Sequence, residues 1–224
     1  MKLLVLVGSS TVPPYDEFMK AQKETWAKVK NEHVNVWFYY AGKETKRIDF
    51  QTFTTECKQD AHYAHWRLKR ALDFVWNWEW DLIFRCHSSS YVNVDLLYDF
   101  IKGFPTQGVY TGRKVGGEGL GLMEWRGAMI KQICVSGAGI LMSRDVADIL
   151  RKNLKEEEDT VEDDVLIGRL LQLHGIERQE MTVGRVDVES MKDYKLHYHY
   201  RFRTNDRQHD MDNMRLVHSI HTRL

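Results

Sequence analysis

Short apolar runs alternate along the chain with longer segments in which apolar residues recur at helical spacing. The apolar or β-branched runs that predict buried strands cover residues 3–7, 34–40, 81–85 and 108–112. The segments at helical spacing follow Pro13–Pro14 and then cover residues 63–78, 94–102, 143–152 and 164–173. Strands that alternate with helices predict an α/β fold, with a mostly parallel central sheet flanked by helices.

Three stretches lack this regular pattern. Residues 113–126 are rich in glycine, contain Trp125 and show no periodicity, so we expect a loop there. Residues 181–186 predict a last strand. A charged tail rich in histidine and arginine follows.

Length and charge limit the classes of protein to consider. The 224 residues fit one domain, 1–224. The 32 basic residues balance the 32 acidic ones, which argues against a nucleic-acid partner. The three cysteines specify neither a disulfide framework nor a metal site. Oligomeric state cannot be read from the sequence.

The apolar runs are also too short for a membrane span. None approaches the roughly 20 residues that cross a bilayer. The N-terminal run is too short for a signal peptide and has no small-residue cleavage site. We therefore expect a cytoplasmic protein.

The loop after the first strand is the first candidate binding site. It consists of small and hydroxyl-bearing residues, Gly8, Ser9, Ser10 and Thr11. Open α/β sheets bind ligands beyond the carboxyl ends of their strands, so this loop suits a nucleotide. It lacks the glycine spacing of a dinucleotide or phosphate-binding motif, and an ordinary strand-to-helix turn is an equal alternative.

A second candidate follows the third strand. Arg85 offers a planar fork for phosphate or carboxylate. His87 follows it, and Ser88, Ser89 and Ser90 offer hydroxyls to a sugar or diphosphate. Capping of the next helix by Ser90 or Asn93 explains part of this segment, but not the whole of it.

Two further segments combine small or acidic residues. Gly137, Ala138 and Gly139 permit close approach to the backbone, and close packing is the simpler explanation. Asp163 and Asp164 stand at a predicted helix start. There a carboxylate acts either as a general base or as a helix cap.

The basic tail supplies the last candidate. In an extended segment, His197, His199, Arg201 and Arg203 point to one side, which could close over a diphosphate with Arg207. The alternative is a solvated strand edge. The histidine density is compatible with a metal, but no spacing specifies a site.

Four segments, in this order, resemble the signatures of family 31 glycosyltransferases, the β-1,3-galactosyltransferase and Fringe group of the GT-A type. Lys23-Glu24-Thr25-Trp26 resembles Glu-Thr-Trp, and residues 84–93 resemble a strand followed by Lys-x-Asp-Asp-Asp-x-Phe-Val-Asn. Residues 136–143 resemble Ser-Gly-x-Gly-Tyr-Val-x-Ser, and residues 163–168 resemble Glu-Asp-Val-x-x-Gly. The resemblance spans most of the fold.

The resemblance implies an inverting glycosyltransferase (a hexosyl- or pentosyltransferase) that moves sugar from a UDP-sugar donor to a hydroxyl of a glycan acceptor. Asp164 stands at the position of the family's catalytic base, with Asp163 as the alternative. The resemblance also divides the single domain into a nucleotide-sugar donor half, 1–112, and an acceptor half with the C-terminal basic tail, 113–224. The acceptor side would be lined by Trp125, Gly137, Ala138 and Gly139.

One departure from the family pattern changes the expected chemistry. His87, Ser88 and Ser89 replace the three aspartates that hold a divalent cation in the family. Serine hydroxyls are poor ligands for a hard cation, so the sequence does not support Mn²⁺ or Mg²⁺ as a cofactor. The chain then looks like viral and bacterial GT-A-like proteins that lack the acidic motif, and Arg85 together with Arg201, Arg203 or Arg207 would supply the positive charge. A catalytically inactive sugar- or nucleotide-binding protein is the alternative function.

Overall fold

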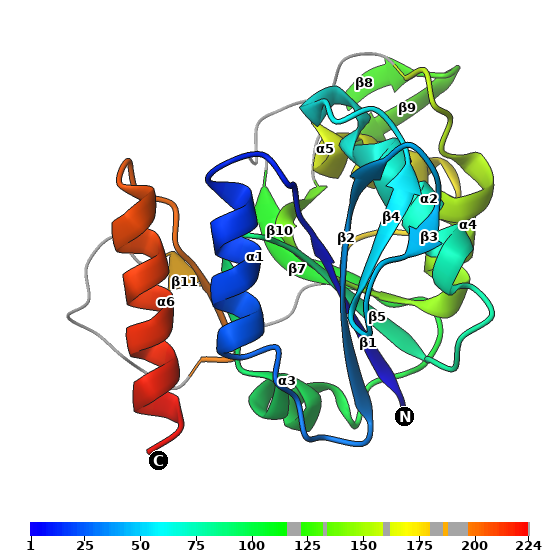
Figure 1. The fold of residues 1–224 in the computed structure, drawn as a ribbon. Helices are drawn as coiled ribbons and strands as arrows, with labels where there is room; N and C mark the ends of the chain where they lie inside the picture. The colour runs from blue at the N-terminus through cyan, green and yellow to red at the C-terminus, as the bar shows by residue number, and fades with distance from the viewer. Residues whose placement is uncertain (116–121, 132–133, 159–161, 180–185, 188–196, 224) are drawn as a thin grey trace.

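The computed structural model describes residues 1–115, 122–131, 134–158, 162–179, 186–187 and 197–223. A seven-stranded sheet forms the centre, in the order β3-β4-β2-β1-β5-β10-β7 (Figure 1). The strands of this sheet are β1 (Leu3–Gly8), β2 (Val34–Gly42), β3 (Lys46–Arg47), β4 (Thr52–Glu56), β5 (Leu82–His87), β7 (Tyr110–Val115) and β10 (Cys134–Ser143).

Pairing within the sheet is mostly parallel at its middle. β1 pairs in parallel with β2 and β5, and β2 pairs in parallel with β4. β10 runs antiparallel to both β5 and β7, and β3 is a short antiparallel edge. The predicted α/β fold class, with a mostly parallel sheet between helices, is confirmed.

Helices cover both faces of the sheet (Figure 1). One apolar cluster joins the sheet to α1 (Tyr15–Glu24), α3 (Val94–Ile101) and α6 (Arg207–His221). The other joins it to α2 (Ala64–Val75), α4 (Arg144–Asn153) and α5 (Asp163–Leu173). A short 3-10 helix, Ala61–Tyr63, precedes α2.

Because side chains alternate along a strand, β1 and β5 supply both clusters. Leu82, Phe84 and Cys86 of β5 enter the first cluster, whereas Ile83 enters the second. Arg85 therefore lies on the same face of the sheet as α5.

Smaller sheets flank the centre. β6 (Ser90–Val92) pairs with β12 (His199–Arg201), which pairs with β11 (Val186–Asp187). β8 (Leu122–Trp125) and β9 (Ala128–Lys131) form a hairpin that packs on α5. Within the described ranges, no helix has the length and apolar character needed to span a bilayer.

Several sequence predictions need correction. The expected loop over residues 113–126 is wrong at both ends, because β7 continues to Val115 and residues 122–125 form β8. Residues 116–121 lie outside the described part of the chain, as do residues 181–185 of the predicted last strand. The tail contains a helix, α6, that was not predicted.

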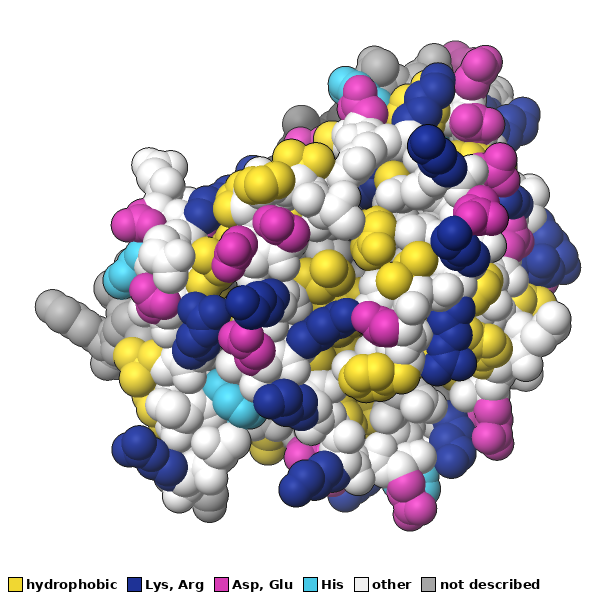
Figure 2. Space-filling model, viewed as in Figure 1, with side chains coloured by type: hydrophobic (Ala, Val, Ile, Leu, Met, Phe, Trp, Pro, Cys, Tyr) yellow, Lys and Arg dark blue, Asp and Glu magenta, His cyan; other side chains and the backbone are white. Residues whose placement is uncertain are grey.

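The viewed surface carries both charge signs. Lysine and arginine side chains alternate there with aspartate and glutamate, without one large patch of either kind (Figure 2). This distribution agrees with the zero formal net charge of the chain.

Candidate functional site

Arg85 is the central side chain of the candidate site. It is 2% exposed, although it lies near the carboxyl end of β5. Its Nη1 donates to the Gly137 carbonyl at 2.7 Å, and its Nη2 donates to the Asp163 carboxylate. Its Nε is buried without a hydrogen-bond partner. The guanidinium therefore faces protein groups, and its expected contact with a donor diphosphate stays a prediction.

An irregularity in β10 makes these contacts available. The register of β10 against β7 shifts between Val135 and Ile140, so the backbone of residues 136–139 leaves that ladder. The Gly137 N–H donates to Asp164 Oδ2 at 3.0 Å, and the Ala138 carbonyl accepts from Ser90 Oγ at 3.2 Å. A Cβ at Gly137 would lie 2.7 Å from Arg85 Nη1, so a larger residue would force the guanidinium to shift.

Two adjacent carboxylates stand in the first turn of α5. Burial alone would raise the pKa of Asp163, but the Arg85 guanidinium, with a smaller effect from His87, holds that pKa below its usual range. His87 Nε2 lies 3.9 Å from Asp163 Oδ2. Asp164 Oδ1 accepts from the Val165 N–H at 2.9 Å. The structure thus brings together His87, Asp163, Asp164 and the small residues of β10.

The turn between β5 and β6 is held from several sides. Gln22 of α1, which is fully buried, donates to the carbonyls of His87 at 3.2 Å and Ser90 at 2.8 Å. The Ser89 carbonyl accepts from the Phe202 N–H at 2.9 Å. The His87 side chain is 30% exposed, so it reaches the surface of the site. Sequence reasoning missed Gln22, whose signal was a polar residue on the inward face of a helix.

Two of the three serines in this turn are buried. Ser90 is fully buried and its Oγ lies 3.1 Å from His199 Nε2, while Ser88 is 7% exposed. Asn93, rather than Ser90, caps α3 by accepting from the Leu96 N–H.

The loop after β1 lies beside this turn, because Gly8 pairs with His87 across the ladder. The Ser9 N–H donates to the Tyr39 carbonyl at 2.9 Å, while the Ser9 Oγ is buried without a partner. Gln59 Nε2 donates to Ser10 Oγ and Thr11 Oγ1, both at 3.1 Å. Gln59 thereby connects the loop to the neighbouring cavity.

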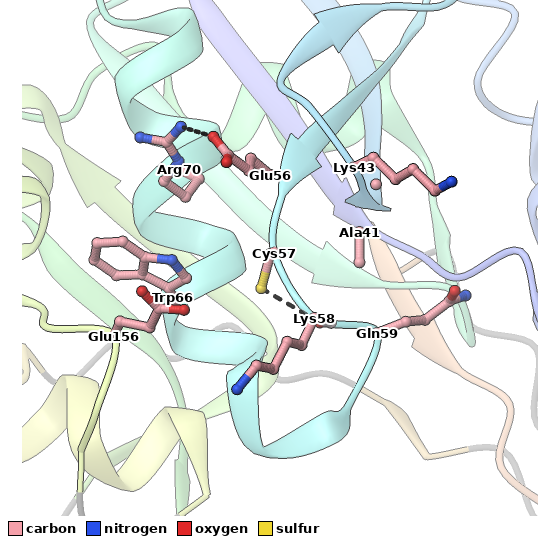
Figure 3. Close-up of a pocket in the computed structure, with 10 residues that line it drawn as sticks. Ala41, Lys43, Glu56, Cys57, Lys58, Gln59, Trp66, Arg70 and Glu156 are labelled. Atoms are coloured by element: carbon pink, nitrogen blue, oxygen red, sulfur yellow. Dashed lines mark hydrogen bonds and ion pairs between the residues drawn. The ribbon is translucent and has the colours of Figure 1, made fainter.

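A cavity of about 630 Å³ opens at the carboxyl ends of β2 and β4 and beside α2 (Figure 3). Trp66 is half-buried on its wall, and Arg70 and Glu56 form an ion pair at 3.2 Å. Its lining residues are Ala41, Gly42, Lys43, Glu56, Cys57, Lys58, Gln59, Trp66, Arg70 and Glu156. Sequence reasoning did not find this cavity, because its residues come from segments with no recognisable motif.

The predicted basic side chains form a group near Asp164. Burial lowers the pKa of Arg201. The nearby cations Arg203, Arg113 and Arg207 lower this pKa further, whereas the Asp164 carboxylate raises it. Arg203 is exposed, and the Arg201 Nε is buried without a hydrogen-bond partner.

Arg207 has an internal partner. Its Nη1 lies 3.1 Å from Asp210 Oδ2. This carboxylate is fully buried, so Arg207 is partly committed to the fold.

The expected acceptor residues lie in packed surroundings. Trp125 is 9% exposed in the cluster that includes α5, and the Arg126 guanidinium lies 4.5 Å from its ring centre. A Cβ at Gly139 would lie 2.6 Å from His199 Cε1. The acceptor role of Trp125, Gly137, Ala138 and Gly139 stays a prediction.

The side chains around the site are the candidate ligands for a metal ion. Within the described residues, no group of three or more histidine, cysteine, aspartate or glutamate side chains gathers closely enough to hold a metal ion. The turn at His87, Ser88 and Ser89 offers hydroxyls and one imidazole, which is a poor donor set for a hard cation.

Comparison with known proteins gives a likeness in structure. The chain matches no family model and no curated protein sequence. It is similar to the crystal structure of a glycosyltransferase involved in the glycosylation of the major capsid of PBCV-1, with a TM-score of 0.55 and 13% identity over 97% of this chain and 100% of that one.

Two further structures show a weaker likeness. The glycosyltransferase GlyE of Streptococcus pneumoniae TIGR4 has a TM-score of 0.45 and 15% identity, over 80% of this chain and 45% of that one. The 2-C-methyl-D-erythritol 4-phosphate cytidylyltransferase of Francisella tularensis has a TM-score of 0.47 and 10% identity, over 97% of this chain and 100% of that one. At these identities, the likeness to the PBCV-1 protein shows a shared fold.

Proposed function

We propose that the protein is an inverting glycosyltransferase that moves sugar from a nucleotide-sugar donor, with UDP as the nucleotide, to a hydroxyl of a glycan. The observation that carries this proposal is the pair Asp163–Asp164, held at the carboxyl edge of the sheet by Arg85 and Gly137. The shared fold with the PBCV-1 glycosyltransferase supports the same reaction class.

The donor would lie across the carboxyl ends of the strands. The cavity beside Trp66 has room for the nucleoside, and the loop at Ser9, Ser10 and Thr11 lies between that cavity and the turn at His87. From β4 to β5 there are three strand spacings, roughly 14 Å, which is about the reach of a nucleoside diphosphate. The unpartnered hydroxyl of Ser9 would donate to this ligand.

Positive charge for the departing diphosphate would come from Arg201 and Arg203. Arg201 is half-buried beside three other arginines, and this repulsion is relieved when a dianion binds. Arg203 is exposed and Arg207 is shared with Asp210. No step of this proposal uses a metal ion.

Asp164 would act as the general base. Its carboxylate takes the proton of the acceptor hydroxyl while that oxygen bonds to the anomeric carbon. The bond from the anomeric carbon to the donor phosphate breaks, and its electron pair leaves with the nucleoside diphosphate. Asp163 is the weaker candidate because its carboxylate pairs with Arg85. Two N–H donors fix the Asp164 carboxylate but leave lone pairs for a third contact.

One observation favours the inactive sugar- or nucleotide-binding alternative. The turn from His87 to Ser90 carries no carboxylate, although the resembling family uses three at this position. Release of UDP from UDP-sugars by purified protein would separate the two functions. A binding protein would hold UDP and release none from its sugar conjugate.

Donor binding is tested first by thermal unfolding with millimolar UDP, in parallel with Mn²⁺ and with EDTA. At 100 times the dissociation constant, a ligand stabilises the folded state by about 2.7 kcal/mol. For a chain of this size, this raises Tm by roughly 5–11 °C. A rise in both conditions supports charge neutralisation by arginine. A rise only with Mn²⁺ contradicts it, and no rise at all contradicts UDP as the nucleotide.

The general base is tested by Asp164→Asn. We expect UDP to bind as before and UDP release from the sugar donor in the presence of acceptor to be lost. Full activity of this variant would exclude Asp164 as the base and return Asp163 to that role.

A further inference from the structure

The surroundings of Arg85 point to a role other than donor binding. We propose that Arg85 is a positioning residue, which holds the two carboxylates of α5 in place and does not touch the donor. The effect of Arg85 on catalysis rests on the proposed glycosyl transfer. Its role in holding the two carboxylates in place does not depend on that function.

The contacts form one continuous chain from β5 to α5. Arg85 Nη2 donates to Asp163, and its Nη1 donates to the Gly137 carbonyl at 2.7 Å. The N–H of the same glycine donates to Asp164 Oδ2 at 3.0 Å. One guanidinium thus fixes Asp163 directly and Asp164 through a single backbone residue.

The Arg85 guanidinium is planar, and the spacing between its two Nη atoms is fixed. A lysine has one charged nitrogen on a flexible stem, so it cannot make both contacts in the same geometry. The lack of a side chain at Gly137 allows the guanidinium to reach the carbonyl, since a Cβ would stand 2.7 Å from Nη1. An arginine opposite a glycine therefore makes both contacts without a shift of either residue.

Arg85 also balances the charge of the carboxylates. Asp163 is 13% exposed and adjoins Asp164 in the first turn of the helix. Burial would raise the pKa of Asp163, and Arg85 holds it low instead. Without this guanidinium, two neighbouring carboxylates would share a poorly solvated site, and one of them would take a proton more readily.

The position of Arg85 argues against a donor contact. Its side chain is 2% exposed and directed at Asp163 and the Gly137 carbonyl, so a phosphate has little access to the N–H groups that these two contacts leave over. If a diphosphate replaced Asp163 as the partner, Asp163 would be left poorly solvated without the Arg85 cation. The two roles therefore predict different effects on UDP affinity.

The catalytic test compares Arg85→Lys with the wild type, measuring UDP affinity by calorimetry and UDP release from the sugar donor with acceptor present. We expect UDP affinity within about twofold and a kcat lower by about 100-fold, the loss typical of a catalytic group displaced by about 1 Å. A tenfold or larger loss of UDP affinity in the same variant would overturn the proposal, because it would place Arg85 on the donor.

The matched control is Arg144→Lys. Arg144 also donates to backbone carbonyls, those of Trp76, Trp78 and Trp80, but it lies near the opposite ends of the strands. We expect lower stability and an unchanged kcat for the folded control. An equal loss of kcat in the control would mean that the loss in Arg85→Lys is a general effect of destabilisation, against the proposal.

A second measurement needs no activity. In a carboxyl ¹³C NMR titration, Asp163 should titrate below the usual range in the wild type and at higher pH in Arg85→Gln. If Arg85→Gln does not fold, Arg85→Lys should show a smaller change in the same direction. An unmoved Asp163 titration in the folded variant would overturn the proposal.

The two kinds of failure are distinguishable. If the wild type neither binds UDP nor releases it, the proposed function fails while the NMR result still decides whether Arg85 holds the carboxylates. The double variant Arg85→Gln/Asp163→Asn removes both charges together, and we expect it to be more stable than the sum of the single changes predicts. Simple additivity would show that the two side chains do not interact.

Discussion

Replacement of Asp210 tests how the C-terminal helix is joined to the basic segment before it. The Asp210 carboxylate is fully buried at the start of α6 and accepts from the Thr204 N–H at 3.0 Å and from the Thr204 hydroxyl at 2.8 Å. Arg207 Nη1 lies 3.1 Å from its other oxygen. In Asp210→Ala, these donors lose their acceptor inside the protein.

The loss of stability in Asp210→Ala depends on how deeply Asp210 and Arg207 are buried. Loss of one member of a buried ion pair costs about 3–5 kcal/mol. Because the Arg207 side chain is 33% exposed, water replaces part of its contact, and we take the low end, about 3 kcal/mol. For a chain of this length, Tm should fall by roughly 6–12 °C. Asp210→Asn keeps the size and one acceptor oxygen, so its loss should be about 1–2 kcal/mol.

Thermal unfolding followed by circular dichroism measures these differences. Asp212→Ala is the matched control, because Asp212 lies on the same helix and is 59% exposed in its pair with Arg215. We expect this control to change the free energy of unfolding by less than about 0.5 kcal/mol. The reasoning is refuted if Asp210→Ala unfolds within about 2 °C of the wild type, or if both variants lose the same stability.

Two further predictions concern packing and pH. Gly139→Ala places a Cβ 2.6 Å from His199 Cε1, so urea unfolding should show a free energy of unfolding lower by about 1–3 kcal/mol. Gly103→Ala is the control, because its added Cβ has no neighbouring atom within 4 Å, and it should not lower this free energy. Equal effects of the two variants would contradict the packing argument. Burial lowers the pKa of His218 and His221, so between their folded pKa values and about 6.5 the unfolded chain binds more protons, and stability should fall as the pH drops through that window. The variant His218→Gln/His221→Gln should show a smaller fall of Tm between about pH 7.5 and pH 5.5; an unchanged pH dependence would assign the fall to other groups.

The central strands could be predicted because they are buried on both faces and therefore consist mainly of apolar residues. Residues 3–7 are apolar without interruption, and helices cover both faces of the strand that they form. The start of α5 was found for a similar local reason, since acidic residues precede an apolar helical pattern.

The missed elements depend on contacts with distant parts of the chain. β6 is only three residues long and is paired by β12, more than a hundred residues later. In α6, the inward face includes the polar residues Asp210 and Asn213 beside Met211 and Met214, so the helical pattern is weak. The β8–β9 hairpin turns at Arg126–Gly127, where both residues have positive φ. The glycine-rich composition of this stretch does not by itself predict a hairpin.

The sequence predicted the residues of the candidate site better than the contacts between them. Arg85 and Asp163 were both singled out, but nothing in a local pattern indicates that two charges 78 residues apart form a pair. Their pairing depends on side-chain alternation along β5 and on the irregular register of β10, which are properties of the assembled sheet.

The long reach of the Arg85 contacts has a consequence for how the chain folds. They close loops of 52 residues to Gly137 and 78 residues to Asp163. Closing such loops costs chain entropy, and the contacts offset this cost only once both ends have met. During synthesis, the β1–β5 region leaves the ribosome with its arginine still without an anion. A fragment that ends before residue 163 would therefore lack the carboxylate that pairs with the buried Arg85 guanidinium.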